Sequence, residues 1–142
     1  MQKERTNSRS KGHTLERKVT NDLKVFFPFA RTSRNGSKIT DDCGIDIIGV
    51  PFNIQIKNGY NKIKFKFEDE FKYTVDKLKL VYPQDDKIHT YPYIFIHKKT
   101  GVKGKIQPEL FQVTMTYDTF IGLISKIYND RVGHKKEDGS QK

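Results

Sequence analysis

The stretch GIDIIGVPFNIQIK, residues 44–57, decides the fold. Its second part, residues 52–57, alternates strictly between apolar and polar side chains, which is the period of a β-strand with two different faces. Its first part, residues 44–49, is rich in isoleucine and also favours a strand, although Asp46 interrupts the apolar run. Two short strands therefore follow each other directly, and the first one carries a carboxylate near its centre.

A four-residue connection, from Gly49 to Phe52, would join these strands into an antiparallel hairpin. The resulting register sets Asp46 opposite Gln55, with Lys57 one pleat further along the same face. We therefore expect three polar side chains to converge. The alternative is that Gln55 and Lys57 lie on a solvated face while Asp46 closes a turn. That alternative fits the first two residues well and an aspartate between isoleucines poorly.

Periodicity and turn residues predict the order α, β, β, β, α, β, β, α for the whole chain. The expected helices cover residues 13–27, 67–80 and 117–128, and the expected strands cover residues 29–34, 44–49, 53–58, 91–98 and 111–115. The last helix is expected to close the core with Phe120, Leu123, Ile124 and Ile127. Residues 1–11 and 129–142 are polar and aperiodic, so we expect a flexible basic arm and a flexible polar tail around a domain at residues 12–128. The expected fold class is α/β, with a central mixed sheet flanked by helices.

The first expected helix carries a carboxylate inside its apolar face. At about 100° per residue the apolar stripe contains Glu16, and Pro28 ends the helix. The stripe consists of Leu15, Val19, Leu23, Phe26 and Phe27. Because an unpaired charge is costly in such a position, Glu16 needs a partner. It either reaches water at the stripe edge, pairs with a buried arginine or belongs to a catalytic site, and the helix alone does not separate these interpretations.

Length and composition fit a single domain with a real core, since 35% of the 142 residues are hydrophobic and 12% are aromatic. A disordered basic chain would lack these aromatic residues, and no apolar run approaches the roughly 18 residues of a membrane span. The lone Cys43 cannot build a disulfide framework, and no secretory signal is expected. We therefore expect a soluble protein of the reducing cytoplasm that does not contact a membrane.

Positive charge is concentrated at the front of the chain. The formal net charge is +10, and residues 1–38 alone hold ten basic and three acidic residues, a net charge of +7. Lysine and arginine that neutralise phosphates release condensed counterions, so a polyanion is the expected partner. The alternative is a solubilising surface, and charge alone does not separate an enzyme from a passive DNA-binding protein.

Asp46, Lys57 and Glu16 form a set that suits metal-dependent phosphodiester hydrolysis. Mg²⁺ prefers hard oxygen ligands and binds through one or two carboxylates together with substrate phosphate oxygens, where it activates the attacking water. Asp46 would be the anchoring ligand. A lysine ammonium beside the metal orients that water and offsets transition-state charge, a role that fits Lys57. Mn²⁺ is the expected substitute metal, and no organic cofactor is expected.

Five segments resemble the PD-(D/E)XK nuclease superfamily, and most closely its Holliday junction resolvases of archaeal and bacteriophage type. They are KGHTLER (11–17), RTSRNGS (31–37), GIDIIGVPFNIQIK (44–57) and, more faintly, YPYIFIHKK (91–99) and QVTMTYDTF (112–120). The resemblance implies a restriction-endonuclease-like αβββαβ core. It also implies that Glu16, Asp46 and Lys57 are catalytic and that Ser37 helps to position the scissile phosphate.

One residue departs from the family pattern, because Gln55 stands where such resolvases have a glutamate two residues before the lysine. An amide oxygen still offers a ligand to a metal ion but carries no negative charge, so affinity for a divalent cation should fall. Glu16 could supply the missing charge. The expected metal ligands are therefore Asp46, Gln55 and Glu16, while Asp41 and Asp42 are interpreted as turn residues.

We expect DNA contacts on the loop before the Asp46 strand and on the first helix. The residues concerned are Arg17, Arg31, Arg34 and Lys38. The resulting hypothesis is a Mg²⁺-dependent endonuclease that is encoded by a bacteriophage and resolves four-way DNA junctions as a homodimer. The alternatives are a repair or restriction nuclease of the same superfamily and a DNA-binding relative that has lost catalysis through Gln55.

Overall fold

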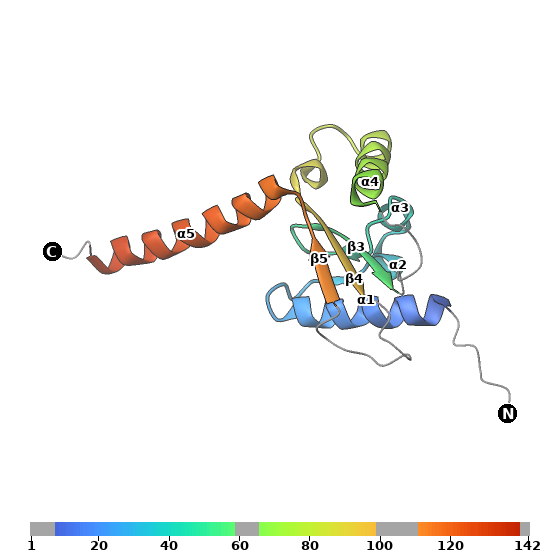
Figure 1. Ribbon diagram of the computed structural model, residues 1–142, viewed down its shortest axis with the longest axis horizontal. Helices are drawn as coiled ribbons and strands as arrows, with labels where there is room; N and C mark the ends of the chain where they lie inside the picture. The colour runs from blue at the N-terminus through green and yellow to red at the C-terminus, as the bar shows by residue number, and fades with distance from the viewer. Residues whose placement is uncertain (1–7, 59–65, 99–110, 140–142) are drawn as a thin grey trace, which may run out of the picture.

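The computed structural model, which describes residues 8–58, 66–98 and 111–139, is built around one five-stranded sheet with strand order β1-β2-β3-β4-β5 (Figure 1). The pairs β1–β2, β2–β3 and β4–β5 are antiparallel, whereas β3 and β4 are parallel. In chain order the elements are α1 (Ser8–Lys24), β1 (Arg31–Thr32), α2 (Ser33–Gly36), α3 (Lys38–Asp42), β2 (Ile47–Ile48), β3 (Asn53–Asn58), α4 (Phe67–Val81), the 3-10 helix η1 (Lys87–Thr90), β4 (Tyr93–Lys98), β5 (Phe111–Thr114) and α5 (Tyr117–Gly139). The expectation of an α/β fold with a mixed sheet flanked by helices is confirmed.

The short elements α2, α3 and η1 are additions to the expected order. Each has four or five residues, which is too short to give a recognisable apolar period. Helix α3 is held by a cap, since the Thr40 amide donates to Ser37 Oγ at 3.3 Å. The loop before β2, which was expected to be irregular, is therefore a pair of small helices.

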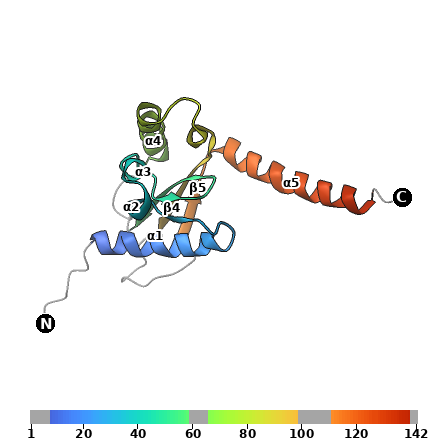
Figure 2. The ribbon, with the colours of Figure 1, turned by 180° about the vertical axis from the view of Figure 1, so that it is seen from behind.

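Helices α1 and α4 lie on opposite sides of the sheet, as both ribbon views show (Figures 1 and 2). Leu15 of α1 belongs to a buried cluster with Ile54 and Ile56 of β3, whereas Leu78 of α4 belongs to a second cluster. The second cluster also contains Cys43, Ile45 and Ile88. Parallel strands need both faces covered, and β3 is buried on both. The interpretation of Gln55 on a solvated face is therefore wrong, since only 5% of that residue is exposed.

The turn between β2 and β3 depends on Gly49. Its φ of +80° lies in the left-handed region, and a Cβ at this position would come within 2.2 Å of the Phe29 carbonyl oxygen. Both the conformation and the close approach therefore require glycine. The expected hairpin is confirmed by the antiparallel pairing of Ile47 with Ile54.

Helix α1 differs from its expected bounds at both ends. It begins at Ser8, so residues 8–11 are helical and not part of an arm, and it ends at Lys24 before Pro28 is reached. The chain leaves the helix through hydrogen bonds from the Phe26 and Phe27 amides to the Leu23 carbonyl. Placement of Phe26 in the apolar stripe is wrong, because 75% of it is exposed. The residue lies beyond the last helical turn and no longer follows the helical period.

Helix α5 is the largest departure from expectation. It continues to Gly139, through most of the segment interpreted as a flexible tail, and the ribbon shows it projecting away from the sheet (Figure 1). Phe120, Ile124 and Ile127 are about half exposed, so their assignment to the core is wrong. Amphipathic spacing indicates that the apolar face of a helix packs against a partner, but it does not identify that partner. Within the part of the chain that the structure describes, no helix is both long enough and apolar enough to cross a membrane.

Candidate active site

Asp46 lies immediately before β2 and is held by the neighbouring strand. Its amide donates to the Ile54 carbonyl at 2.8 Å, and its Oδ2 accepts a hydrogen bond from the Ile56 amide at 2.7 Å. The pairing of Ile47 with Ile54 puts Asp46 level with Gln55, as the hairpin register predicts. The aspartate therefore interrupts an isoleucine run because its carboxylate is bonded to a strand amide.

The carboxyl group of Asp46 titrates near neutral pH. Its pKa is raised to about 7, chiefly by burial and also by the nearby Glu16 and Asp41 carboxylates, while the Ile56 hydrogen bond and the Lys57 ammonium lower it. Three acidic groups and one lysine thus influence one another at this position. Strongly perturbed pKa values with specific charged neighbours are typical of functional sites.

Glu16 is 4% exposed and has an arginine partner. Arg34 donates from Nε to Oε2 at 3.1 Å and from Nη2 to Oε1 at 3.3 Å, which is the two-point geometry that matches guanidinium to carboxylate. The expectation that this acid lies inside the apolar face of the helix is confirmed. Arg34, which was expected to contact DNA, thus uses two of its N–H groups to bind Glu16. About two fifths of its side chain is exposed.

Gln55 is turned toward β4 and α4. Its Oε1 accepts a hydrogen bond from the Tyr93 hydroxyl, and its Nε2 donates to Glu70 Oε2 at 3.3 Å. Burial raises the pKa of Tyr93 above its ordinary value, and the Glu70 and Asp46 carboxylates add to this effect. Tyr93 therefore remains a hydrogen-bond donor at any physiological pH. Both polar atoms of the Gln55 side chain therefore have protein partners.

Three residues at this site were not predicted from the sequence, namely Asp41, Glu70 and Tyr93. In the sequence, Glu70 was explained by its place in the first turn of a helix, where a carboxylate is stabilised by the positive helix N-terminus. Its position nonetheless gave a signal, because it lies roughly 60° from Phe67 on the flank of the apolar stripe, while Glu68 and Asp69 point to solvent. Tyr93 gave no such signal, since its partner is on a neighbouring strand.

Asp41 was interpreted as a turn residue, and the structure places it in α3 beside the site. Ser33 links it to Asp46, because the Ser33 hydroxyl donates to Asp41 Oδ1 at 3.2 Å and the Ser33 amide donates to the Asp46 carbonyl at 2.9 Å. The Ser33 side chain is fully buried. This serine thus fixes the two acidic residues relative to each other.

Ser37 has hydrogen bonds within its own loop. Its Oγ lies 2.9 Å from Thr40 Oγ1 and caps α3, and the Thr40 hydroxyl lies 2.5 Å from the Tyr82 hydroxyl. A role in positioning the scissile phosphate stays a prediction. The other residues expected to contact DNA, Arg17, Arg31 and Lys38, are exposed on the elements that carry or adjoin Glu16 and Arg34.

The site contains two carboxylates, Glu16 and Asp46, which are the ligand type that hard divalent cations prefer. Glu16 is buried and Asp46 is partly buried, and the Glu16 carboxylate is one of the groups that raise the pKa of Asp46. A hard cation at this position would relieve that repulsion. In residues 8–58, 66–98 and 111–139, no three His, Cys, Asp or Glu side chains are close enough together to bind one ion. A cation here would therefore use water and substrate oxygens for its remaining ligands.

Comparisons of the chain with known protein families, with curated proteins and with solved structures found no match. The interpretation of the site therefore depends on its own residues.

Proposed function

We propose that the protein is a metal-dependent DNA endonuclease of the PD-(D/E)XK type that cleaves four-way junctions. The observation that carries this proposal is the partly buried Asp46, whose pKa is raised to about 7 beside Glu16 and Lys57. The order α1, β1, β2, β3, α4, β4 agrees with the αβββαβ core that the resemblance implies. In this proposal the hairpin of β2 and β3 presents the site, and α1 supplies its second carboxylate.

Asp46, Glu16 and Gln55 would hold Mg²⁺, or Mn²⁺ in its place. When bound, the cation supplies positive charge that polarises the phosphate group and favours ionisation of the attacking water. Asp46 must be ionised to bind it, so binding should improve as pH rises through about 7. Arg34 keeps Glu16 oriented, and the Glu70–Gln55–Tyr93 hydrogen bonds fix the amide that stands where the family has glutamate.

Lys57 has the position of the catalytic lysine. It lies two residues after Gln55 on β3, and its ammonium is close enough to Asp46 to act on the pKa of that group. A cation there orients the attacking water and offsets the charge that develops on the phosphate oxygens. The exposed Arg17, Arg31 and Lys38 would contact the phosphates of the DNA arms.

The test is cleavage of a labelled four-way junction beside linear duplex of the same sequence, with Mg²⁺ and with EDTA. We expect paired nicks on the junction only and no cutting in EDTA. Asp46→Asn should lower the rate about 100-fold or more and preserve binding, because it removes the charge that holds the cation. Asp69→Asn is the matched control, since it makes the same exchange at an exposed position on α4. Full activity of the Asp46 variant would overturn the site assignment.

A second candidate is a DNA-binding relative without catalysis. It is favoured by one observation, namely that both polar atoms of the Gln55 side chain already have protein partners. This candidate predicts a junction gel shift that is unaffected by Mg²⁺ and no nicks at any pH. Cutting of linear duplex as fast as of the junction would instead indicate a repair or restriction nuclease.

A further inference from the structure

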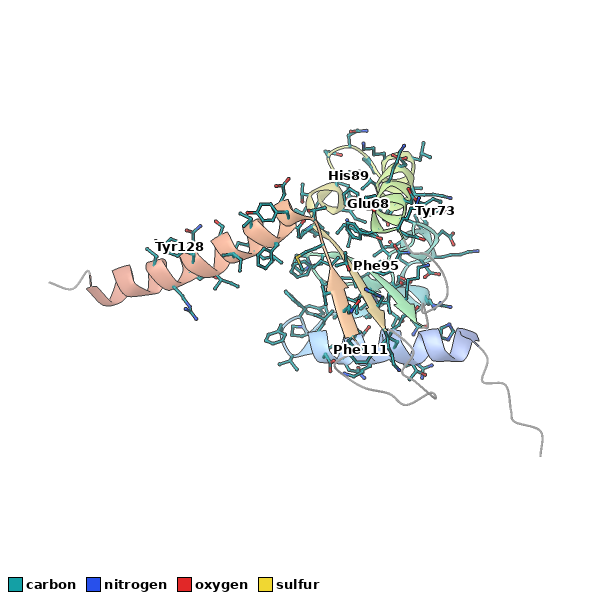
Figure 3. All side chains as sticks on the ribbon, in the orientation of Figure 1. Glu68, Tyr73, His89, Phe95, Phe111 and Tyr128 are labelled. Carbon is teal, nitrogen blue, oxygen red and sulfur yellow. The ribbon has the colours of Figure 1, made fainter. Side chains whose placement is uncertain are left out.

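Helix α5 carries an apolar face that the described residues of the chain leave exposed. Six large side chains on it have exposed fractions between 45% and 76%. These side chains, called the α5 face below, are Tyr117, Phe120, Ile121, Ile124, Ile127 and Tyr128. The stick view shows Tyr128 far from the sheet residues Phe95 and Phe111 (Figure 3).

The six residues form one continuous stripe. Their spacings of three, one, three, three and one place them within an arc of roughly 120° at 3.6 residues per turn. The opposite side carries polar and small residues, among them Asp118, Gly122, Lys126 and Asp130. A stripe of this width with a polar back is the pattern by which two helices pack side by side.

Without a partner this helix would be marginal. Its face is rich in isoleucine and aromatic residues, which are weaker helix formers than alanine or leucine, and most helix stability in proteins comes from packing of the apolar face. At about 200 Å² for each large side chain, the α5 face exposes on the order of 600–700 Å². Two such faces together would bury roughly 1,200–1,400 Å², which is within the size range of specific protein interfaces.

The charge of α5 favours a second copy of the same chain over other partners. Residues 117–139 contain four acidic and four basic residues, so this segment is formally neutral in a chain of net charge +10. Two α5 helices can therefore meet without the repulsion that would oppose contact between the basic surfaces around residues 1–38. DNA, in contrast, would find no excess positive charge on this helix.

We infer that the α5 face binds the α5 face of a second chain and forms a dimer with two-fold symmetry. Such an interface uses the same patch on both subunits, and the self-complementary apolar stripe meets that requirement. Under the proposed function, this contact would bring two active sites into one particle. The inference itself depends on α5 alone and not on nuclease activity.

The experiment is analytical ultracentrifugation of the full chain, without DNA and in EDTA. We expect a mass of twice 16.6 kDa that falls toward 16.6 kDa on dilution. Ile124→Lys should shift the dissociation constant upward by about 100-fold or more, because it places a charge in the middle of the buried stripe. Leu80→Lys is the matched control, since Leu80 is an 85% exposed apolar residue on α4 and its exchange should leave the dimer intact.

A cross-link gives a second, independent measurement. Ile124→Cys lies near the middle of the stripe, and the only native cysteine, Cys43, is buried. Mild oxidation should give a disulfide-linked dimer in this variant and not in Leu80→Cys. A single-chain mass at the highest soluble concentration, or a dimer that survives Ile124→Lys, would overturn the inference. A dimer without junction cleavage would count against the proposed function only.

Discussion

Helices α1 and α5 are both amphipathic, yet among the residues that the structure describes only the apolar face of α1 is covered. Leu15 of α1 is 5% exposed against β3, whereas Ile124 of α5 is 47% exposed. The covered face even accommodates a charge, since Glu16 is buried beside Leu15 with Arg34 as its partner. An apolar stripe in the sequence thus indicates the need for a packing partner, and only the tertiary structure tells whether that partner lies in the same chain.

The largest effect should come from placing a carboxylate on each face in turn. Leu15→Asp should lower the free energy of unfolding by about 5 kcal/mol or more, because it buries a charge without a partner. Ile124→Asp should change it by less than about 0.5 kcal/mol in dilute, monomeric protein, since the side chain is largely exposed there. Urea denaturation followed by circular dichroism measures both. Equal losses for the two variants would mean that α5 packs against its own chain.

The next effect concerns Asp46, whose pKa is raised chiefly by burial and in smaller part by the Glu16 carboxylate of α1. The carboxyl pKa of Asp46 is raised from 3.8 to about 7 in the folded chain, so the folded state keeps a proton that the unfolded state loses between these values. Stability from this group therefore decreases as pH rises from about 4 to about 7. Asp46→Asn removes this dependence, and its stability relative to the native chain should rise by roughly 3–4 kcal/mol between pH 4 and pH 8.

Urea titrations in EDTA across this pH range measure that difference, and Asp69→Asn serves as the exposed control. A relative stability of Asp46→Asn that stays flat or falls with pH would contradict the assignment of a buried, neutral carboxyl group. Saturating Mg²⁺ should stabilise the native chain at pH 8 and not the Asp46 variant, because ligand that binds only the folded state adds to stability.

Local patterns were sufficient for the existence and order of the strands and for the Asp46 position. They were not sufficient for the strand bounds, since β1 (Arg31–Thr32) and β2 (Ile47–Ile48) are shorter than the expected ranges 29–34 and 44–49. The alternation in residues 52–57 and the glycine at position 49 define the hairpin without tertiary information, and the burial of Glu16 follows from its place on the helix. These features depend on neighbours within a few residues along the chain. They were therefore accessible to periodicity and turn chemistry.

The environment of Gln55 could not be predicted in the same way. Its partners, Tyr93 and Glu70, are 38 and 15 residues away in sequence, and they meet it because β4 pairs with β3 in parallel while α4 covers their common face. The same limit applies to α5, whose stripe was visible although its covering partner was not. Sequence patterns show which helices and strands have an apolar face that must be buried. Which element distant in sequence packs against that face depends on the fold as a whole.

The smallest effect compares two ion pairs that start from the same helix. Arg34→Gln should cost about 2 kcal/mol, because the buried Glu16 carboxylate loses its two-point partner, while the half-exposed guanidinium limits the loss. Lys18→Gln breaks the Lys18–Asp22 pair, which is as short at 2.9 Å but mostly exposed, and should cost less than about 0.5 kcal/mol.

The double variant Glu16→Gln, Arg34→Gln separates the cost of an unpaired buried charge from the loss of packing. With both charges removed, most of the stability lost in Arg34→Gln should return. High salt should change the free energy of unfolding of Lys18→Gln and of the native chain by the same amount, because the exposed Lys18–Asp22 pair contributes little. A loss in Arg34→Gln as small as in Lys18→Gln would show that Glu16 has another compensating partner. A hydrogen-bond donor or cation other than Arg34 would then keep this carboxylate inside the apolar face of α1.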